Sequence, residues 1–160
     1  MIKVLIVEDD PMVAELNRRY LAKIEGFVVK GIAANYQQAL EFLACEDVDL
    51  MLVDIFMPGM NGLELLGKIR TCGHAVDVIM VTAARDTESL KTALRLGAID
   101  YLIKPFEFER LHMAMQKYKA RVEGIHCRQT VCQHDIDDHL LGRRSRCALP
   151  KGLDKITLQP

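Results

Sequence analysis

The stretch KVLIVEDDP, residues 3–11, places four apolar residues directly before three carboxylates. The apolar run at residues 4–7 is typical of a buried β-strand, so Glu8, Asp9 and Asp10 gather three negative charges at the end of that strand. Like charges held close together disfavour a fold. A divalent cation bound among them would turn this cost into a gain, and the stretch therefore predicts a cation site at the strand end.

The alternation of apolar runs with amphipathic segments continues to about residue 123. The expected strands cover residues 2–7, 27–33, 49–54, 76–83 and 99–105. The expected helices cover residues 11–24, 36–45 and 62–70, a segment from residue 86 or 87 to about 96, and residues 107–122. Strands that alternate with helices in this way predict an α/β fold with a parallel sheet covered on both faces.

Composition narrows the class of protein. Half of the 160 residues are hydrophobic, which is enough for a packed core. The formal net charge of −1 gives no general attraction to nucleic acid or to an anionic membrane. We expect a cytoplasmic protein, because no signal peptide or membrane span is visible and the five cysteines do not form a disulfide pattern.

Chemically active side chains stand at the ends of four expected strands. They are Glu8 and Asp9 after the first strand, Asp54 in the third, Thr82 in the fourth and Lys104 in the fifth. The carboxyl ends of parallel strands meet at one edge of the sheet, where such folds place their sites. Carboxylates there suit Mg²⁺, and a carboxylate can also attack phosphorus. A lysine and a hydroxyl would then hold the phosphoryl oxygens.

Four motifs, VEDD, LVDIFMPGMNG, VTA and YLIKPF, carry a family resemblance. In this order and spacing they resemble the receiver domain of two-component response regulators, over residues 1–123. The resemblance implies a flavodoxin-like (βα)5 fold, a doubly wound parallel sheet with strand order 2-1-3-4-5. It also implies a phosphoacceptor signalling domain rather than an enzyme, with a sensor histidine kinase as partner.

The resemblance assigns roles to individual residues. Asp54 matches the phosphoacceptor, and the implied Mg²⁺ ligands are Glu8, Asp9, Asp54 and the backbone carbonyl of Phe56. Thr82 and Lys104 match the pair that contacts the phosphoryl group, and Tyr101 matches an aromatic switch residue. The family also implies a cis bond between Lys104 and Pro105. The face formed by the fourth helix, fifth strand and fifth helix is the expected surface for dimerisation or output.

A finer resemblance points to the regulators of citrate and C4-dicarboxylate metabolism. It is carried by MVAELNRRYL, by the extension past residue 123 and by RCALPKGLDKITLQ. It implies control of transcription, with residues 124–160 as a helix extension and linker toward a helix-turn-helix DNA-binding domain. Because the chain stops at Pro160, the resemblance implies a fragment without that domain, so contact with DNA is expected only through the missing part.

Several features leave alternatives open. Asp10 is either a member of the acidic site or the cap of the helix that starts at Pro11. The tail holds possible zinc ligands, but their spacing matches no common zinc module, and a helix extension with a linker is favoured. Its arginines either contact DNA phosphates or are solvated, and solvation is favoured. The residues concerned are His126, Cys127, Cys132, His134, His139, Arg143, Arg144 and Arg146.

Two other functions compete with a transcriptional regulator. A Mg²⁺-dependent phosphatase with an aspartyl intermediate would need an acid two residues after its nucleophile, but Phe56 stands there. A stand-alone receiver would signal by protein contact alone. The linker-like character of residues 143–160 favours a longer regulator over a stand-alone receiver.

Overall fold

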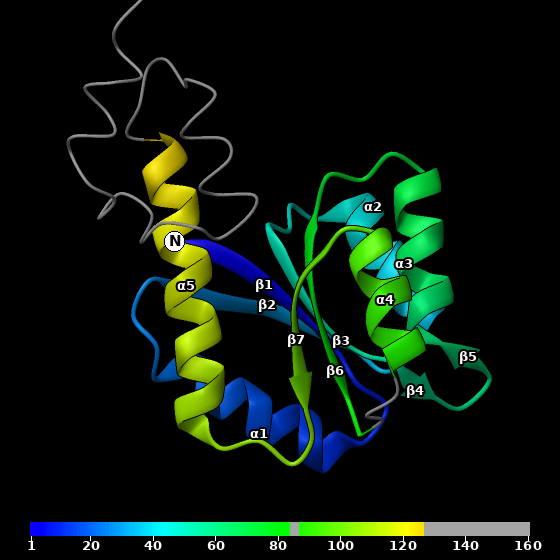
Figure 1. Ribbon diagram of the computed structural model, residues 1–160, viewed down its shortest axis with the longest axis horizontal. Helices are drawn as coiled ribbons and strands as arrows, with labels where there is room; N and C mark the ends of the chain where they lie inside the picture. The colour runs from blue at the N-terminus through cyan, green and yellow to red at the C-terminus, as the bar shows by residue number, and fades with distance from the viewer. Residues whose placement is uncertain (84–86, 127–160) are drawn as a thin grey trace, which may run out of the picture. The chain divides into compact units, whose positions relative to one another are not determined.

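The computed structural model describes residues 1–83 and 87–126. The chain divides into two compact units, Met1–Gln116 and Lys117–Pro160. The first unit contains every strand and most of the helices that the structure describes (Figure 1). The Cys and His residues of 127–139 and the three tail arginines lie outside the described residues.

Five parallel strands form the central sheet in the order β2-β1-β3-β6-β7. Numbered among themselves, these strands have the order 2-1-3-4-5, which confirms the predicted flavodoxin-like topology. β3 is buried along its whole length, as expected of a strand that is covered on both faces. The bounds of the strands are β1 Ile2–Val7, β2 Phe27–Ala33, β3 Leu50–Asp54, β6 Asp77–Thr82 and β7 Ala98–Ile103.

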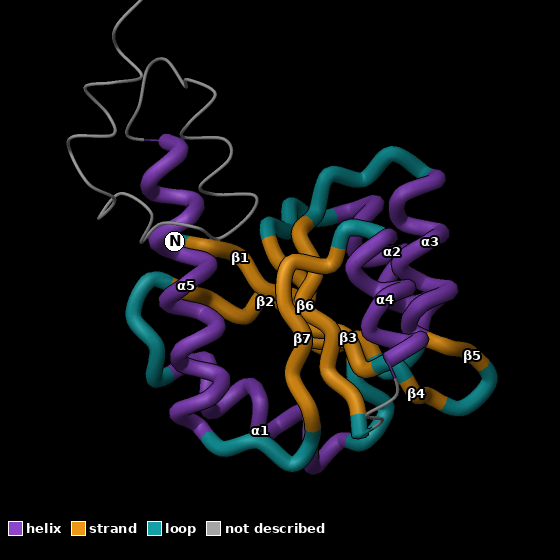
Figure 2. Tube along the Cα trace, viewed as in Figure 1, coloured by secondary structure: helices purple, strands orange, loops and turns teal. Residues whose placement is uncertain are grey.

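Helices cover both faces of this sheet (Figure 2). α1 (Pro11–Ala22) and the first part of α5 (Phe108–His126) lie along one face, whereas α2 (Tyr36–Cys45), α3 (Gly62–Thr71) and α4 (Thr87–Arg95) lie along the other. Successive side chains of a strand point to opposite faces of the sheet and pack against different helices. Val53 on β3, for example, joins Leu65 and Leu66 of α3 in one buried apolar cluster. Within the described ranges, no helix combines the length and apolarity needed to cross a membrane.

Side-chain caps fix where three of the helices begin. Asp10 Oδ1 accepts the backbone N–H of Met12 at 2.9 Å, and Pro11 occupies the first helical turn of α1. This resolves the alternative left open for Asp10 in favour of a helix cap. Asn35 caps α2, because its Oδ1 accepts the backbone N–H of Gln38 at 2.9 Å.

The structure also differs from the predicted elements in detail. The loop expected after the third strand contains a small antiparallel hairpin, β4 (Phe56–Met57) and β5 (Met60–Asn61). The fifth strand of the sheet ends at Ile103, because Pro105 has no N–H to offer a neighbouring strand. The bond between Lys104 and Pro105 is cis, as the family resemblance implied.

Candidate functional site

The register of the sheet brings the predicted site residues to one edge. Val7 pairs with Val53, so Glu8 and Asp54 follow on neighbouring strands. Asp54 pairs with Val81, the residue before Thr82. Thr82 pairs with Ile103, the residue before Lys104, and the Lys104 backbone N–H donates to the Thr82 carbonyl at 2.7 Å. The register therefore brings the polar ends of four strands to one edge of the sheet.

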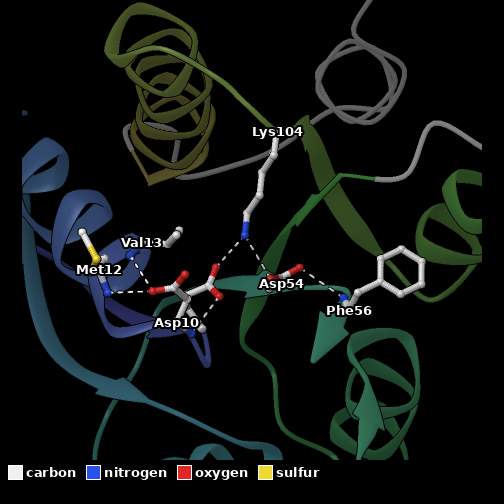
Figure 3. A network of polar contacts seen from close by, with 7 residues as sticks. Asp10, Met12, Val13, Asp54, Phe56 and Lys104 are labelled. Atoms are coloured by element: carbon white, nitrogen blue, oxygen red, sulfur yellow. Dashed lines mark hydrogen bonds and ion pairs between the residues drawn. The ribbon is translucent and has the colours of Figure 1, made fainter. Parts of the chain in front are cut away.

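Lys104 connects the two buried carboxylates of the site. Its Nζ lies 2.7 Å from Oε2 of Glu8 and 3.0 Å from Oδ2 of Asp54 (Figure 3). Glu8 and Asp54 are buried, and the lysine side chain retains 22% of its exposure. The ammonium thus stays within reach of solvent while it holds the two carboxylates together.

Burial and charge act against each other in this group. Burial would lower the pKa of Lys104, but the hydrogen bonds and charges of Glu8 and Asp54 outweigh burial and raise the pKa above its usual value. Burial raises the pKa of Glu8, and the negative charge of Asp54 raises it further, against the opposing effect of Lys104. The cluster therefore holds its negative charge at a cost.

Asp9 completes a set of three carboxylates. One oxygen each from Glu8, Asp9 and Asp54 can be chosen so that all lie within 4.8 Å of one another. Two ligands on opposite sides of Mg²⁺ are about 4.2 Å apart, so oxygens within 4.8 Å of one another are close to the spacing that this ion needs. Three carboxylates against one ammonium leave an excess of negative charge, and a divalent cation would balance that excess.

Backbone N–H groups orient the remaining carboxylate oxygens. Asp54 Oδ1 accepts the N–H of Phe56 at 3.1 Å, and Glu8 Oε1 accepts the N–H of Asp10 at 3.2 Å. Each buried carboxylate therefore presents one oxygen to Lys104 and the other to the backbone (Figure 3). The Phe56 side chain is about half exposed beside Asp54.

The two predicted switch residues occupy different surroundings. Thr82 is fully buried at the end of β6. Tyr101 lies on β7, three residues before Lys104, where it is half-buried and packs against the apolar cluster of the α2–α4 face. It lines a surface hollow of about 570 Å³ together with Ile103 and Met113. Tyr101 thus lies near the site along the strand.

Gly62 contributes to the site in a way that the sequence does not predict. The sequence pattern marks this glycine only as a residue that interrupts a loop and begins a helix. In the structure its N–H donates to the Ile55 carbonyl at 2.6 Å, so the chain returns to the residue that follows Asp54. No periodic pattern marks this contact, because the strands of the intervening hairpin have only two residues each.

Known proteins share this arrangement of sequence and fold. The family model described as "Response regulator receiver domain" matches residues 4–116. The chain is 49% identical to the transcriptional regulatory protein MalR of Bacillus subtilis, over 99% of this chain and 69% of the relative. It is 39% identical to the probable C4-dicarboxylate response regulator DctR of Priestia megaterium, over 98% of this chain and 69% of the relative.

A solved structure shows the same fold. The response regulator TrrA of Thermotoga maritima, in complex with Mg²⁺ and BeF, superposes with a TM-score of 0.64 at 32% sequence identity. The match covers 73% of this chain and 98% of that one. The similarity therefore extends over the part of the chain that contains the sheet and the carboxylate cluster.

Proposed function

The chain belongs to the response regulator receiver family, and on that premise we propose that Asp54 accepts a phosphoryl group from a sensor histidine kinase. One observation carries the proposal: Asp54 is buried at a strand end, where Lys104 joins it to Glu8, beside a third carboxylate. A carboxylate in ordinary surroundings is a poor phosphorus nucleophile. This one stands among groups that can balance the charge of the transferred phosphoryl group.

The transfer follows from the positions of these groups. An oxygen of Asp54 attacks the phosphorus of the kinase phosphohistidine while the N–P bond breaks and its electron pair returns to the imidazole nitrogen. Lys104 Nζ, already 3.0 Å from Asp54 Oδ2, moves to a phosphoryl oxygen, and the Thr82 hydroxyl holds another. The Phe56 N–H keeps Asp54 Oδ1 in place during the attack.

Mg²⁺ is the cofactor of this proposal. Glu8, Asp9, Asp54 and the Phe56 carbonyl would hold the ion, which supplies positive charge beside the phosphoryl oxygens when it is bound. The carboxylate spacing supports the assignment. The similar regulator from Thermotoga maritima was solved in complex with Mg²⁺ and BeF.

Phosphorylation then changes the balance of the Lys104 network. The new group adds about −1.5 to −2 charges, and Lys104 gives up its bond to Glu8 in order to reach it. Thr82 turns toward the phosphoryl group and Tyr101 moves into the space that becomes available. The face of α4, β7 and the first part of α5 repacks, and this face serves as the dimerisation or output surface.

The names of the relatives suggest the process that this switch controls. We assign the chain to the control of genes for citrate or C4-dicarboxylate metabolism, because DctR is described as a probable C4-dicarboxylate response regulator. Residues 1–123 act as the receiver, and residues 124–160 connect it to an output domain that contacts DNA. The setting is the cytoplasm, with no membrane contact.

Phosphorylation by a small donor tests the assignment. Purified chain treated with acetyl phosphate and Mg²⁺ should carry one phosphoryl group, mapped by mass spectrometry to Asp54. Asp54→Asn should abolish the label, because the amide is not a phosphorus nucleophile. Asp10→Asn is the matched control, since asparagine caps a helix as well as aspartate does. Full labelling of the Asp54→Asn variant would refute the proposal.

A further inference from the structure

We propose that Gly62 is a positioning residue for the phosphoacceptor site: its lack of a side chain lets α3 begin directly against the backbone of Asp54 and Ile55. This inference rests on the proposed function and adds a determinant of Mg²⁺ affinity to it. Gly62 lies eight residues after Asp54 and supplies no ligand of its own, so its effect is exerted through the backbone.

The space at Gly62 is closed by main-chain atoms. A Cβ at this position would overlap the carbonyl oxygen of Asp54 and would stand 2.8 Å from the Cα of Ile55. Flexible side chains can move away from such a contact, but these atoms belong to the strand end that carries the phosphoacceptor. The φ angle of Gly62 is not positive, so the glycine is needed for space rather than for an unusual backbone torsion.

The start of α3 is not free to move away from this contact. The Gly62 N–H is bonded to the Ile55 carbonyl at 2.6 Å. Asn61 fixes the start of α3, because its Oδ1 accepts the Leu63 N–H at 2.7 Å. The helix that follows is held to the sheet by the buried side chains of Leu65 and Ile69. An added methyl group therefore moves the backbone of Asp54 rather than the helix.

The site has little tolerance for such a movement. Asp54 holds Lys104 Nζ at 3.0 Å and the Phe56 N–H at 3.1 Å. The chosen carboxylate oxygens of Glu8, Asp9 and Asp54 lie within 4.8 Å of one another, close to the span of about 4.2 Å between opposite ligands of Mg²⁺. A displacement of Asp54 disturbs this spacing.

Gly67 offers a matched control on the same helix. A Cβ there would meet nothing within 4 Å, and its φ is also not positive. Gly62→Ala and Gly67→Ala therefore make the same chemical change five residues apart in α3. Only the first should reach the site.

The experiment measures Mg²⁺ affinity by isothermal titration and the initial rate of labelling by acetyl phosphate, on the full chain and well below the unfolding temperature. Gly62→Ala should weaken Mg²⁺ binding by about tenfold to a hundredfold, the usual effect of disturbing groups that orient metal ligands. Labelling should slow with it. Gly67→Ala should match the wild type in both measurements.

A purely structural role for Gly62 predicts a different outcome. Gly62→Ala would then lower the unfolding temperature and leave the Mg²⁺ affinity of the folded protein unchanged, which would overturn the inference. If neither the wild type nor Gly67→Ala bound Mg²⁺ or took up the label, the proposed function itself would fail instead.

A second pair of variants covers the case in which Gly62→Ala does not fold. Asn61→Ala removes the cap that fixes the position of Gly62, and should reduce Mg²⁺ affinity in the same direction but less. Asn35→Ala removes an equivalent cap from α2, away from the site, and should leave affinity unchanged. Equal affinities in the two cap variants would overturn the inference.

Discussion

Two polar networks occupy opposite edges of the same sheet, and they differ in the charge of the groups that they bring together. At the carboxyl edge, one ammonium faces the three carboxylates of Glu8, Asp9 and Asp54. At the amino edge, the Arg70 guanidinium donates to four backbone carbonyls just before β6 and β7. They belong to His74, Val76, Leu96 and Gly97, at distances of 3.2, 2.7, 3.1 and 3.4 Å.

The two networks differ in what they leave unbalanced. Arg70 binds the end of α3 to the segments that lead into β6 and β7. Its acceptors are neutral backbone carbonyls, so no like charges are brought close together. The Lys104 network keeps an excess of negative charge in a partly buried place. The amino edge is thus built for stability, whereas the carboxyl edge holds an excess of charge that suits the cation and the phosphoryl group of the proposed function.

Loss of Arg70 should produce the largest change in stability. Arg70→Met keeps most of the apolar stem but removes four hydrogen bonds, so we expect the free energy of unfolding to fall by about 2 kcal/mol. Urea unfolding measures the change, with Lys68→Met on the exposed side of the same helix as control. Equal midpoints for the two variants would break the proposed contrast between the edges.

Loss of one site charge should change stability in the opposite direction. Asp9→Asn removes a negative charge from the cluster, and unit charges about 4 Å apart repel by about 1 kcal/mol even in a water-like medium. In the presence of a chelator, the free energy of unfolding should rise by about that amount, while Mg²⁺ binding is lost.

Asp10→Asn removes the same charge just outside the cluster and controls for the change in net charge. If Asp9→Asn were less stable than the wild type without metal, the carboxyl edge would not be under strain from its own charges.

The smallest effect should come from the exposed ion pairs of α1, which belong to neither network. Glu15 lies 2.6 Å from Arg18 and 3.1 Å from Arg19, and the hydrogen bonds from Arg18 and Arg19 lower the pKa of its carboxyl to about 2. Because the pKa is lowered on folding, the ionised carboxyl stabilises the fold at pH values above its ordinary pKa of 4.5. This stabilisation is lost as the pH falls toward 2.

Because this group is exposed, solvent screens most of the benefit. Glu15→Gln should therefore leave the unfolding temperature at neutral pH nearly unchanged. A shift as large as that of Arg70→Met would show that surface charge, rather than the two sheet edges, controls stability.

The sequence predicts the carboxyl edge better than the amino edge, for a physical reason. A charge at the end of an apolar strand is conspicuous, and parallel topology alone brings Glu8, Asp54 and Lys104 to the same place. An arginine near the end of a helix looks like any solvated residue. Its acceptors at residues 96–97 lie 26 and 27 positions further along the chain and are backbone atoms, which every residue has.

Boundaries and close contacts escape prediction for a related reason. Periodicity locates β2 and α2 to the residue, but it gives no sign of the hairpin formed by β4 and β5. The contact between Gly62 and the Asp54 backbone depends on how α3 packs, and glycine is common in loops whether or not another segment approaches it closely. The pattern within one segment predicts that segment's secondary structure, but it does not predict a contact that forms only when two segments pack together.

The ion pair between Glu8 and Lys104 joins residues 96 positions apart, with Asp54 close to midway between them. A nascent chain cannot form this pair until its last sheet strand has been added. Under the proposed function, a chain still on the ribosome at that stage would lack the assembled site and would not receive a phosphoryl group from the kinase.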